Sequence, residues 1–324
     1  MRYARALIPA LLIPLAAVVP ASGQESETPP TVIESVEASP EGSGFSVAAG
    51  VDWGGTAPAV LGTDPTGDAP PAANATGAHG LDLTEVSAWI EDGDELEATF
   101  AFDLATFDNP PPPEIVRYYM TFLVNGQAVA LQAKTSDFAS GANLSDNPET
   151  LAENIGSYAE HISQTGELPQ FRVRGNCGTV AVIQNCGHVA WVSGEFDTAG
   201  NQIRIEVPLD LEDLPILRPG ASLDPDQGAW ASLQAGADNA PTRDTMAAGA
   251  QEGLPYEIPR RAATAALRDG AGTVVSGPVA LSVSEEGDVQ GQVSAAGLAA
   301  GDYELVVSAC IAANCGTTSI PVTI

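Results

Sequence analysis

The sequence predicts an all-β protein built from antiparallel strands that pack as β-sandwiches. Polar and apolar residues alternate along several segments, which gives each predicted strand one face for a core. Turns rich in Asp, Asn and Gly join neighbouring segments, as they do in β-hairpins. Because the alternation has a period of two almost throughout, we expect cores made from strand faces.

The first predicted hairpin covers residues 85–102 and turns at residues 91–94. Its apolar residues share one face of the two strands: Val86, Ala88, Ile90, Leu96, Ala98, Phe100 and Phe102. A further hairpin is predicted between residues 190–196 and residues 203–207, across a polar turn.

The second predicted hairpin turns at the Asn-Gly pair of residues 125–126. This pair suits a type I′ turn, because both central positions of that turn need positive φ. In the register that the turn sets, Phe122 faces Val129 and Met120 faces Leu131.

One short helical excursion is predicted over residues 148–163. Asn147 can cap such a helix, and Pro148 suits its first position. Its apolar residues recur at helical spacing: Leu151, Ile155, Tyr158 and Ile162. Covering an open sheet edge is the expected role, and forming the lip of a binding cleft is the alternative.

Residues 1–23 have the composition of a signal peptide. Two arginines lie in residues 1–5, an apolar run follows over residues 6–19, and small residues lead up to Gly23. The apolar run is shorter than the roughly 20 residues that a membrane-spanning helix needs. We therefore expect a secreted, extracellular protein without membrane insertion after cleavage.

The composition predicts two folded domains after the signal. Residues 24–50 are acidic and rich in Ser, Glu, Gly and Pro, which predicts a disordered linker. Residues 51–258 form the first predicted domain, in which residues 60–80 look loop-like. A break near residue 258 precedes a small second domain, residues 259–324, with turns at 269–270, 286–287 and 301–302.

The chain is strongly acidic, with 42 Asp and Glu against 12 Lys and Arg and a formal net charge of −30. Nucleic acid and anionic lipid are poor partners for such a surface, because both bind through clustered Lys and Arg. Divalent cations are compatible with it.

The four cysteines predict two disulfides, as expected for an exported protein. They fall into two local pairs, Cys177 with Cys186 and Cys310 with Cys315. A zinc site is the alternative, but it would need two closely spaced pairs and only the second comes close.

Two stretches resemble known families. The first comprises Asp64–Asp68, Leu81–Val86, the Asp92-Gly-Asp94 turn and Tyr119–Gly126. It is similar to the DOMON-like superfamily, which includes family nine carbohydrate-binding modules. The resemblance implies a jelly-roll-like sandwich that binds sugars, or haem in some relatives.

The second stretch is Gly301–Cys310 together with Asn314–Gly316. It resembles a bacterial immunoglobulin-like domain, which implies a small C-terminal immunoglobulin-like sandwich. Fold does not establish function, so both resemblances serve as expectations.

One acidic cluster has the spacing of a calcium site: Asp64, Asp68, Asp82 and Glu85. Calcium takes six to eight oxygen ligands, and a Pro/Gly turn beside a strand start can supply them. The alternative is that Asp simply favours turns. Asp224 and Asp226 form a weaker case of the same kind.

Trp89 and Tyr119 are the candidate ligand-binding aromatics. Both alternate to the polar faces of their strands, where a flat ring could stack on a sugar. A second packed face would bury them equally well. Haem ligation by Met120 is a further alternative, although Met120 shares the apolar face with Phe122 and so favours core packing.

The sequence carries none of the common catalytic motifs for hydrolysis, phosphate transfer or dinucleotide binding. The leading hypothesis is a secreted, non-enzymatic binding module. Its expected partner is a carbohydrate in the form of a polysaccharide, or a cell-surface protein. The alternatives are a structural or adhesive surface protein with sandwich domains as spacers, and a secreted hydrolase.

Overall fold

The computed structural model begins to describe the chain at residue 30. The described ranges are 30–32, 37–41, 43–67, 82–91, 96–107, 115–135, 170–175, 187–212, 214–234, 242–245, 253–284 and 287–324. The predicted signal peptide (residues 1–23) and the predicted helix (residues 148–163) lie outside these ranges, as do Cys177 and Cys186. These features stay predictions.

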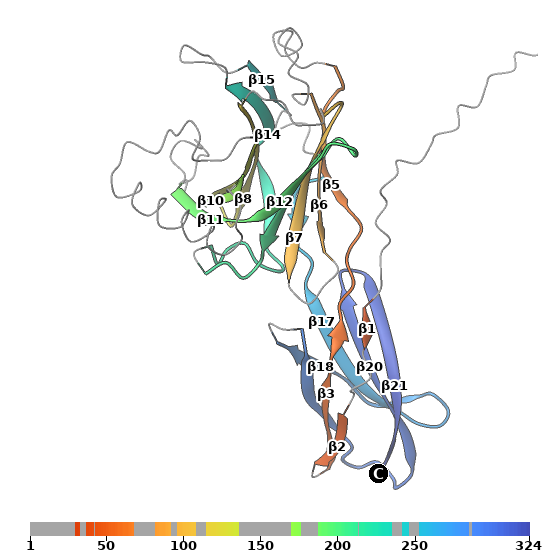
Figure 1. Cartoon of the computed structure of the whole chain (residues 1–324). Coiled ribbons are helices and arrows are strands. Elements are labelled where there is room, and N and C mark those ends of the chain that lie inside the picture. Colours follow the sequence, from red (N-terminus) through yellow and green to blue (C-terminus); the bar gives the residue numbers. More distant parts are fainter. Residues whose placement is uncertain are drawn as a thin grey trace, which may run out of the picture.

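Every regular element in the described ranges is a β-strand, and all strand pairs are antiparallel. The predicted all-β sandwich class is therefore confirmed. Figure 1 shows an upper body that contains the strands from β5 to β15 and a lower body that contains β1 to β3 and β17 to β21. Within those ranges, no helix is long and apolar enough to cross a membrane.

Two sheets form the upper body. Sheet I has the order β12 (Ser193–Asp197), β13 (Gln202–Pro208), β7 (Glu97–Leu104), β6 (Leu83–Ile90) and β5 (Ala59–Thr63). Sheet II has the order β11 (Gly187–Trp191), β10 (Phe171–Gly175), β9 (Gln127–Lys134), β8 (Ile115–Val124), β14 (Ser222–Gln234) and β15 (Thr242–Thr245). The short strand β16 (Tyr256–Glu257) also pairs with β14.

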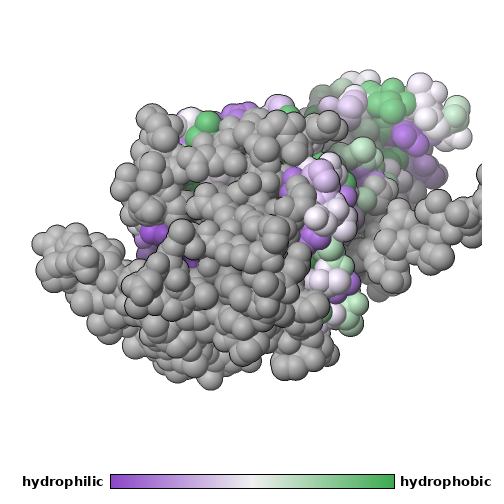
Figure 2. Space-filling view, turned by 90° about the horizontal axis from the view of Figure 1, so that it is seen from above, coloured by the Kyte–Doolittle hydropathy of each residue, from purple (hydrophilic) through white to green (hydrophobic). Residues whose placement is uncertain are grey.

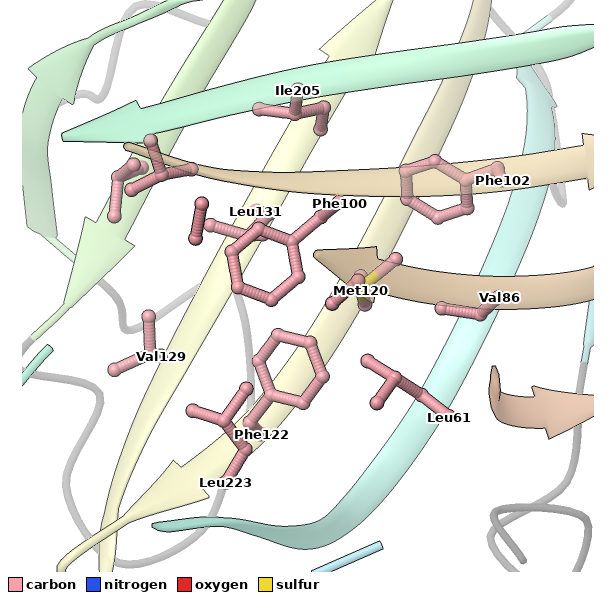
Figure 3. Packing of buried hydrophobic residues seen from close by; sticks show 14 of the residues in the cluster. Leu61, Val86, Phe100, Phe102, Met120, Phe122, Val129, Leu131, Ile205 and Leu223 are labelled. Carbon is pink, nitrogen blue, oxygen red and sulfur yellow. The ribbon is translucent and has the colours of Figure 1, made fainter. Parts of the chain in front are cut away.

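The core of the upper body lies between these two sheets. Phe100 of β7 and Phe122 of β8 pack with ring centroids 5.5 Å apart, and both side chains are at most 2% exposed. Figure 3 shows Met120 among Leu131 and the two phenylalanines, with its thioether inside this core. Met120 therefore packs in the core, as the sequence favoured, and its face of β8 is apolar for that reason.

The predicted hairpin registers are confirmed. Asn125 and Gly126 have φ values of 51° and 75°, as a type I′ turn requires. Phe122 pairs with Val129, and the next pair along the ladder is Met120 with Leu131. The strands β6 and β7 likewise pair across the first predicted turn.

The third predicted hairpin is correct only in part. Residues 190–196 do not form one strand, because Trp191 ends β11 in sheet II and Ser193 begins β12 in sheet I. The chain crosses between the sheets at the buried residue Val192, whose N–H donates to the carbonyl of Phe171 at 3.3 Å. The alternation of period two runs through this crossing, so the sequence pattern hides it.

The interpretation of residues 60–80 as loop is wrong at its start. Ala59–Thr63 forms β5, which pairs with β6 at the edge of sheet I. Leu61 is buried in the core, whereas Val60 is 45% exposed. The segment is short and contains Gly62, so its composition resembles that of a loop.

A single seven-stranded sheet, sheet III, forms the lower body. Its order is β2 (Glu37–Glu41), β3 (Gly44–Ala49), β19 (Val289–Ser294), β18 (Val274–Val283), β17 (Arg261–Arg268), β20 (Asp302–Ile311) and β21 (Asn314–Thr323). The strands β1 (Thr31–Val32) and β4 (Val51–Asp52) pair with each other, and β1 contacts β20 and β21.

The predicted linker over residues 24–50 is wrong for residues 37–41 and 44–49, which form β2 and β3. Strand β3 pairs with β19 over its full length, and Phe45, Val47 and Ala49 are at most 5% exposed. They pack with side chains of β17, β18, β19, β20 and β21 in one hydrophobic cluster. The small domain predicted for residues 259–324 therefore includes the N-terminal strands, and the upper sandwich is inserted between them.

Trp53 marks the point where the chain leaves the lower body. Its side chain is 1% exposed and belongs to the lower core, so the predicted domain start at residue 51 is also displaced. The indole N–H donates to the carbonyl of Gly287 at 2.7 Å, and the guanidinium of Arg261 lies over the indole ring at 5.5 Å. Because Arg261 begins β17, the exit and return points of the chain lie side by side.

The tip of the β20–β21 hairpin connects the two bodies. Cys310 and Cys315 are a cross-strand pair joined by a disulfide, as predicted, with Cα atoms 4.1 Å apart. The neighbouring Ile311 is 0% exposed and belongs to the core of the upper sandwich, together with Ile258. The disulfide thus closes the turn that carries Ile311 into the upper body.

Truncation of Phe45 tests whether β3 belongs to the lower core. We expect Phe45→Ala to reduce the free energy of unfolding of the lower body by about 3–5 kcal/mol, because the change opens a cavity among buried side chains. Val274→Ala, at a residue 44% exposed, is the matched control and should cost less than about 0.5 kcal/mol. Equal, small effects in denaturant unfolding would show that residues 24–50 are a linker.

Removal of the Cys310–Cys315 disulfide should destabilise the lower body modestly. The bond closes a loop with a sequence separation of 5, for which the loss of chain entropy corresponds to about 2 kcal/mol. We expect the Cys310→Ser/Cys315→Ser variant to unfold sheet III at a lower denaturant concentration. Faster amide hydrogen exchange in β20 would report this loss of stability. An unchanged exchange rate in β20 would contradict this expectation.

Candidate functional site

The described surface offers no large apolar patch as a candidate site. Figure 2 shows hydrophobic and hydrophilic side chains interspersed among the described residues seen from above. Among residues whose side chains are described, Val60 and Val274 are the exposed large hydrophobic ones, and they lie in different bodies. The candidates are therefore the outer faces of sheets I and II, which carry polar side chains.

The structure brings part of the predicted calcium cluster together. The N–H of Asp64 donates to the carbonyl of Thr84 at 2.8 Å, which holds the turn beside the start of β6. The N–H of Gly67 donates to both carboxylate oxygens of Asp82, at 3.0 and 2.8 Å. Asp82 thus stabilises the turn, as the alternative interpretation of these aspartates expects.

Calcium binding itself stays a prediction. Asp68 lies outside the described residues, and within them no group of three or more His, Cys, Asp or Glu side chains is placed to hold a metal ion. Asp224 accepts a hydrogen bond from the hydroxyl of Ser222 at 3.1 Å, and the side chain of Asp226 is not described.

Trp89 is a structural residue of sheet I. Its side chain is 3% exposed, and its indole N–H donates to Glu91 Oε1 at 2.8 Å. The hydroxyl of Thr99, opposite Trp89 on β7, donates to the same oxygen. The ring is therefore not presented for stacking, and the alternative of a second packed face applies to it.

The outer face of sheet I is acidic. Burial raises the pKa of Glu85 above its ordinary value, and the nearby charge of Asp103 adds to the effect. Burial also raises the pKa of Glu206, with further contributions from Glu91 and Glu195. Like charges gathered in this way repel an anionic ligand.

The side of sheet II that points away from the core is basic and largely buried, and we call it the basic face. Its side chains point away from the core because they alternate with core residues along β8, β9 and β10. It comprises Arg117, Tyr119, Gln132, Lys134, Arg172, Arg174, His188 and Trp191. These residues include four of the 12 Lys and Arg residues of the chain.

Cross-strand pairing places the members of the basic face in rows. Tyr119 pairs with Gln132, Gln132 with Arg172, and Arg172 with Trp191, so one row crosses four strands. Arg117 pairs with Lys134 in a neighbouring row. Arg174 and His188 form a third pair, beyond a register shift in β10.

The first row has a fixed geometry. Arg172 Nε donates to Gln132 Oε1 at 2.6 Å, and the guanidinium carbon lies 5.9 Å from the centroid of the Trp191 ring. The His188 ring packs on the same indole, with centroids 4.4 Å apart. Gln132 is 1% exposed and Tyr119 is 7% exposed, whereas Arg172, His188 and Trp191 are half-buried. The row thus has a buried floor and a partly accessible end.

The electrostatics of the basic face reflect burial of like charges. Burial lowers the pKa of Arg172 to about 9, and Arg174 and Arg117 lower it further against the effect of Tyr119. Burial also lowers the pKa of Arg174. The imidazole of His188 is affected in the same way, and its pKa falls to about 4 through burial, Arg172 and Arg174. At neutral pH the arginines stay charged and His188 is neutral.

Of the two predicted aromatic residues, only Tyr119 lies on this face, and the basic residues and Trp191 were not predicted. A signal was present in Phe171-Arg-Val-Arg174, where basic and apolar residues alternate. That pattern places Arg172 and Arg174 on one face of a strand. It does not reveal that β10 pairs with β9, which brings them beside Gln132 and Lys134.

Comparisons with family models, with curated proteins and with solved structures find no match. The resemblances to DOMON-like and immunoglobulin-like domains therefore rest on the sequence segments alone. What the chain does must be argued from its own geometry.

His188 should make stability depend on pH. Its ordinary pKa is 6.5 and its folded pKa is about 4, so between these values the unfolded chain binds a proton that the folded chain does not. The contribution of His188 to stability is thus complete above pH 6.5 and is lost progressively as the pH falls toward 4. We expect His188→Gln to reduce this loss, measured as urea midpoints at pH 7.5, 5 and 4.

The difference between wild type and variant isolates His188 from the carboxylates. Glu85 and Glu206 have raised pKa values, so their contribution has the opposite sign and favours the folded state at low pH. This contribution is common to both proteins. Parallel pH curves for wild type and His188→Gln would contradict the assignment.

Proposed function

We propose that the protein is a secreted, non-enzymatic module that binds carbohydrate, and that its ligand approaches Trp191 and His188, the half-buried end of the row. The observation that carries the proposal is the row of Tyr119, Gln132, Arg172 and Trp191 across four strands. It combines aromatic rings, an amide and a guanidinium on one rigid sheet. At the half-buried end of the row, the Trp191 ring can stack against a sugar ring, and polar groups of Arg172 and His188 beside it can hydrogen-bond hydroxyl groups.

Rigidity of the row supports binding with little loss of entropy. Each member stands on a strand whose opposite face is packed in the sandwich core. The contacts of Arg172 with Gln132 and Trp191 already restrict the longest side chain of the row. A side chain that is ordered before binding loses less conformational freedom on binding.

The two-body architecture separates the row from the lower body. The lower body holds the C-terminus and both connections to the sandwich, so it can support the upper body without contributing to the row (Figure 1). A supporting role for the lower body joins the binding hypothesis to the spacer hypothesis. In this proposal the sandwich binds and sheet III supports it.

Retention on polysaccharides tests the proposal. We expect the full chain to be retarded in gels that contain at least one of a panel of polysaccharides, and Trp191→Ala to lose that retardation because a half-buried ring of the row is removed. Tyr303→Ala, at a half-buried aromatic residue of the lower body, is the control and should bind normally. Absence of retardation by every polymer would refute carbohydrate binding.

A further inference from the structure

A short outgoing segment of chain leads from the lower body to the sandwich. Trp53 still belongs to the lower core. Thr56 already belongs to the sandwich, because its N–H donates to the carbonyl of Ile90 in β6 at 3.0 Å. Gly54 and Gly55 therefore cross between the bodies. Glycine restricts the backbone less than other residues do, so this segment permits the bodies to reorient.

The return segment is equally short. Ile258 is held by the sandwich, since its N–H donates to the carbonyl of Ala221 at 2.9 Å and its carbonyl accepts from the N–H of Gly220 at 2.7 Å. Arg261 already begins β17 of the lower body, so residues 259–260 cross back. Two such segments keep the bodies adjacent, but backbone rotations within them can change the relative orientation of the bodies.

Ile311 restricts that reorientation. It ends β20 of the lower body, yet its side chain is 0% exposed and belongs to the sandwich core. It pairs with Arg261 across β17 and β20, so it lies beside the return segment. Any reorientation that withdraws Ile311 exposes its apolar side chain to water, which is unfavourable.

The turn that follows Ile311 depends on covalent closure. Ala312 and Ala313 connect β20 to β21, and the φ of Ala312 is 50°. Positive φ crowds the β-carbon of an L-residue, so Asn and Gly are preferred in such turns. Both alanines are exposed, so core packing does not compensate. The disulfide of Cys310 and Cys315, the cross-strand pair next to the turn, holds it closed.

We propose that this disulfide is a redox-sensitive lock on the joint between the two bodies, where the joint comprises residues 54–55, residues 259–260 and Ile311. In the oxidised chain, the closed turn keeps Ile311 in the sandwich core. Reduction by a dithiol opens the turn and releases Ile311. The bodies then reorient about the two short segments.

The sulfur atoms differ in access. Cys315 is exposed and Cys310 is half-buried, so a dithiol reaches Cys315 first. A thiolate of the dithiol attacks Sγ of Cys315, the S–S bond breaks, and Cys310 leaves as a thiolate that takes up a proton. The second thiolate of the dithiol then closes a ring disulfide within the reductant and releases Cys315 as a thiol. Two electrons and two protons pass from the dithiol to the chain.

Release of the tip differs from unfolding of sheet III. The ladder of β20 and β21 continues from the tip to the pair of Asp302 and Thr323. Along it, Leu305 and Val307 are 0% exposed and belong to the lower core. These contacts keep the hairpin folded after reduction, although the lower body is less stable.

Residual dipolar couplings of backbone amides in the full chain test the lock, because they report the relative orientation of the bodies. We expect one alignment tensor to fit β7 and β8 together with β18 and β19 in the oxidised chain. After reduction by dithiothreitol, and in Cys310→Ser/Cys315→Ser without reductant, the two bodies should need separate tensors. A single tensor after reduction, with the reduced state verified by mass spectrometry, would overturn the lock. Separate tensors in the oxidised wild type would also overturn it.

Single-residue variants test whether the lock acts through Ile311. We expect Ile311→Ala, with the disulfide intact, to need separate tensors without reductant. Ile320→Ala is the matched control on the same hairpin, because Ile320 packs half-buried against the lower core, and it should keep a single tensor. A single tensor in Ile311→Ala would overturn the inference.

A second control assigns the effect of dithiothreitol to the right cysteines. Cys177→Ser/Cys186→Ser should keep a single tensor without reductant, because the lock is intact in that variant. Separate tensors in this variant or in Ile320→Ala would overturn the assignment to the joint. If Cys310→Ser/Cys315→Ser does not fold, the reduced wild type and Ile311→Ala decide the question.

Discussion

The antiparallel pairing of β3 with β19 is the constraint on which the rest of the structure depends. It joins residues near the N-terminus to residues near the C-terminus in one sheet, with Phe45, Val47 and Ala49 in its core. Without this pairing the lower body would lose an inner strand and expose the apolar faces of β19 and its neighbours. A domain of this size buries little apolar surface, so the loss of one inner strand would destabilise it strongly. The lower body is therefore complete only when both ends of the chain are present.

This pairing also fixes how the sandwich is held. The chain leaves the lower body at Trp53 and returns at Arg261, and those two side chains stack on each other. Close exit and return points are what an inserted domain needs, because the host sheet is then undisturbed by the insertion. Ile311 adds a third connection, since it reaches from the β20–β21 hairpin into the sandwich core. In the described part of the chain, the two chain connections and Ile311 thus join the upper body to the lower body.

Within the sandwich, the core and the basic face follow from the same strands. Phe171 and Val173 point into the core, and the residues between and after them, Arg172 and Arg174, point outward. Core packing therefore fixes the backbone that positions the arginines. The side chains of the basic face thus gain their order from the apolar face of the same strands.

Local elements could be predicted from the sequence because short-range chemistry determines them. The Asn-Gly turn at residues 125–126 requires positive φ, and that turn fixes the ladder of β8 and β9. Long-range pairings could not be predicted in this way. The alternation of Phe45 and Val47 was present but lay in an acidic, Ser-rich segment, and its partner β19 lies more than 200 residues away.

The candidate site shows the same limit. Tyr119 was predicted as an aromatic residue on the polar face of its strand, and it does lie on the outer side of sheet II. Trp89 was predicted from the same alternation of faces along a strand, yet it is a buried structural residue whose indole N–H donates to Glu91. Alternation along a strand assigns a side chain to a face, but it does not show whether that face is covered. Prediction of the basic face would have required the pairing of β9 with β10. That pairing joins residues 127–134 to residues 171–175, which are distant in the sequence.

Two shortened chains of the lower body test whether β3 and β19 depend on each other. One contains residues 259–324 alone, and the other joins residues 30–56 through a short Gly/Ser linker to residues 259–324. We expect the joined chain to fold cooperatively, with slowly exchanging amides in β3 and β19, and the isolated segment not to fold. A cooperative unfolding transition of equal stability in the isolated segment would contradict this expectation.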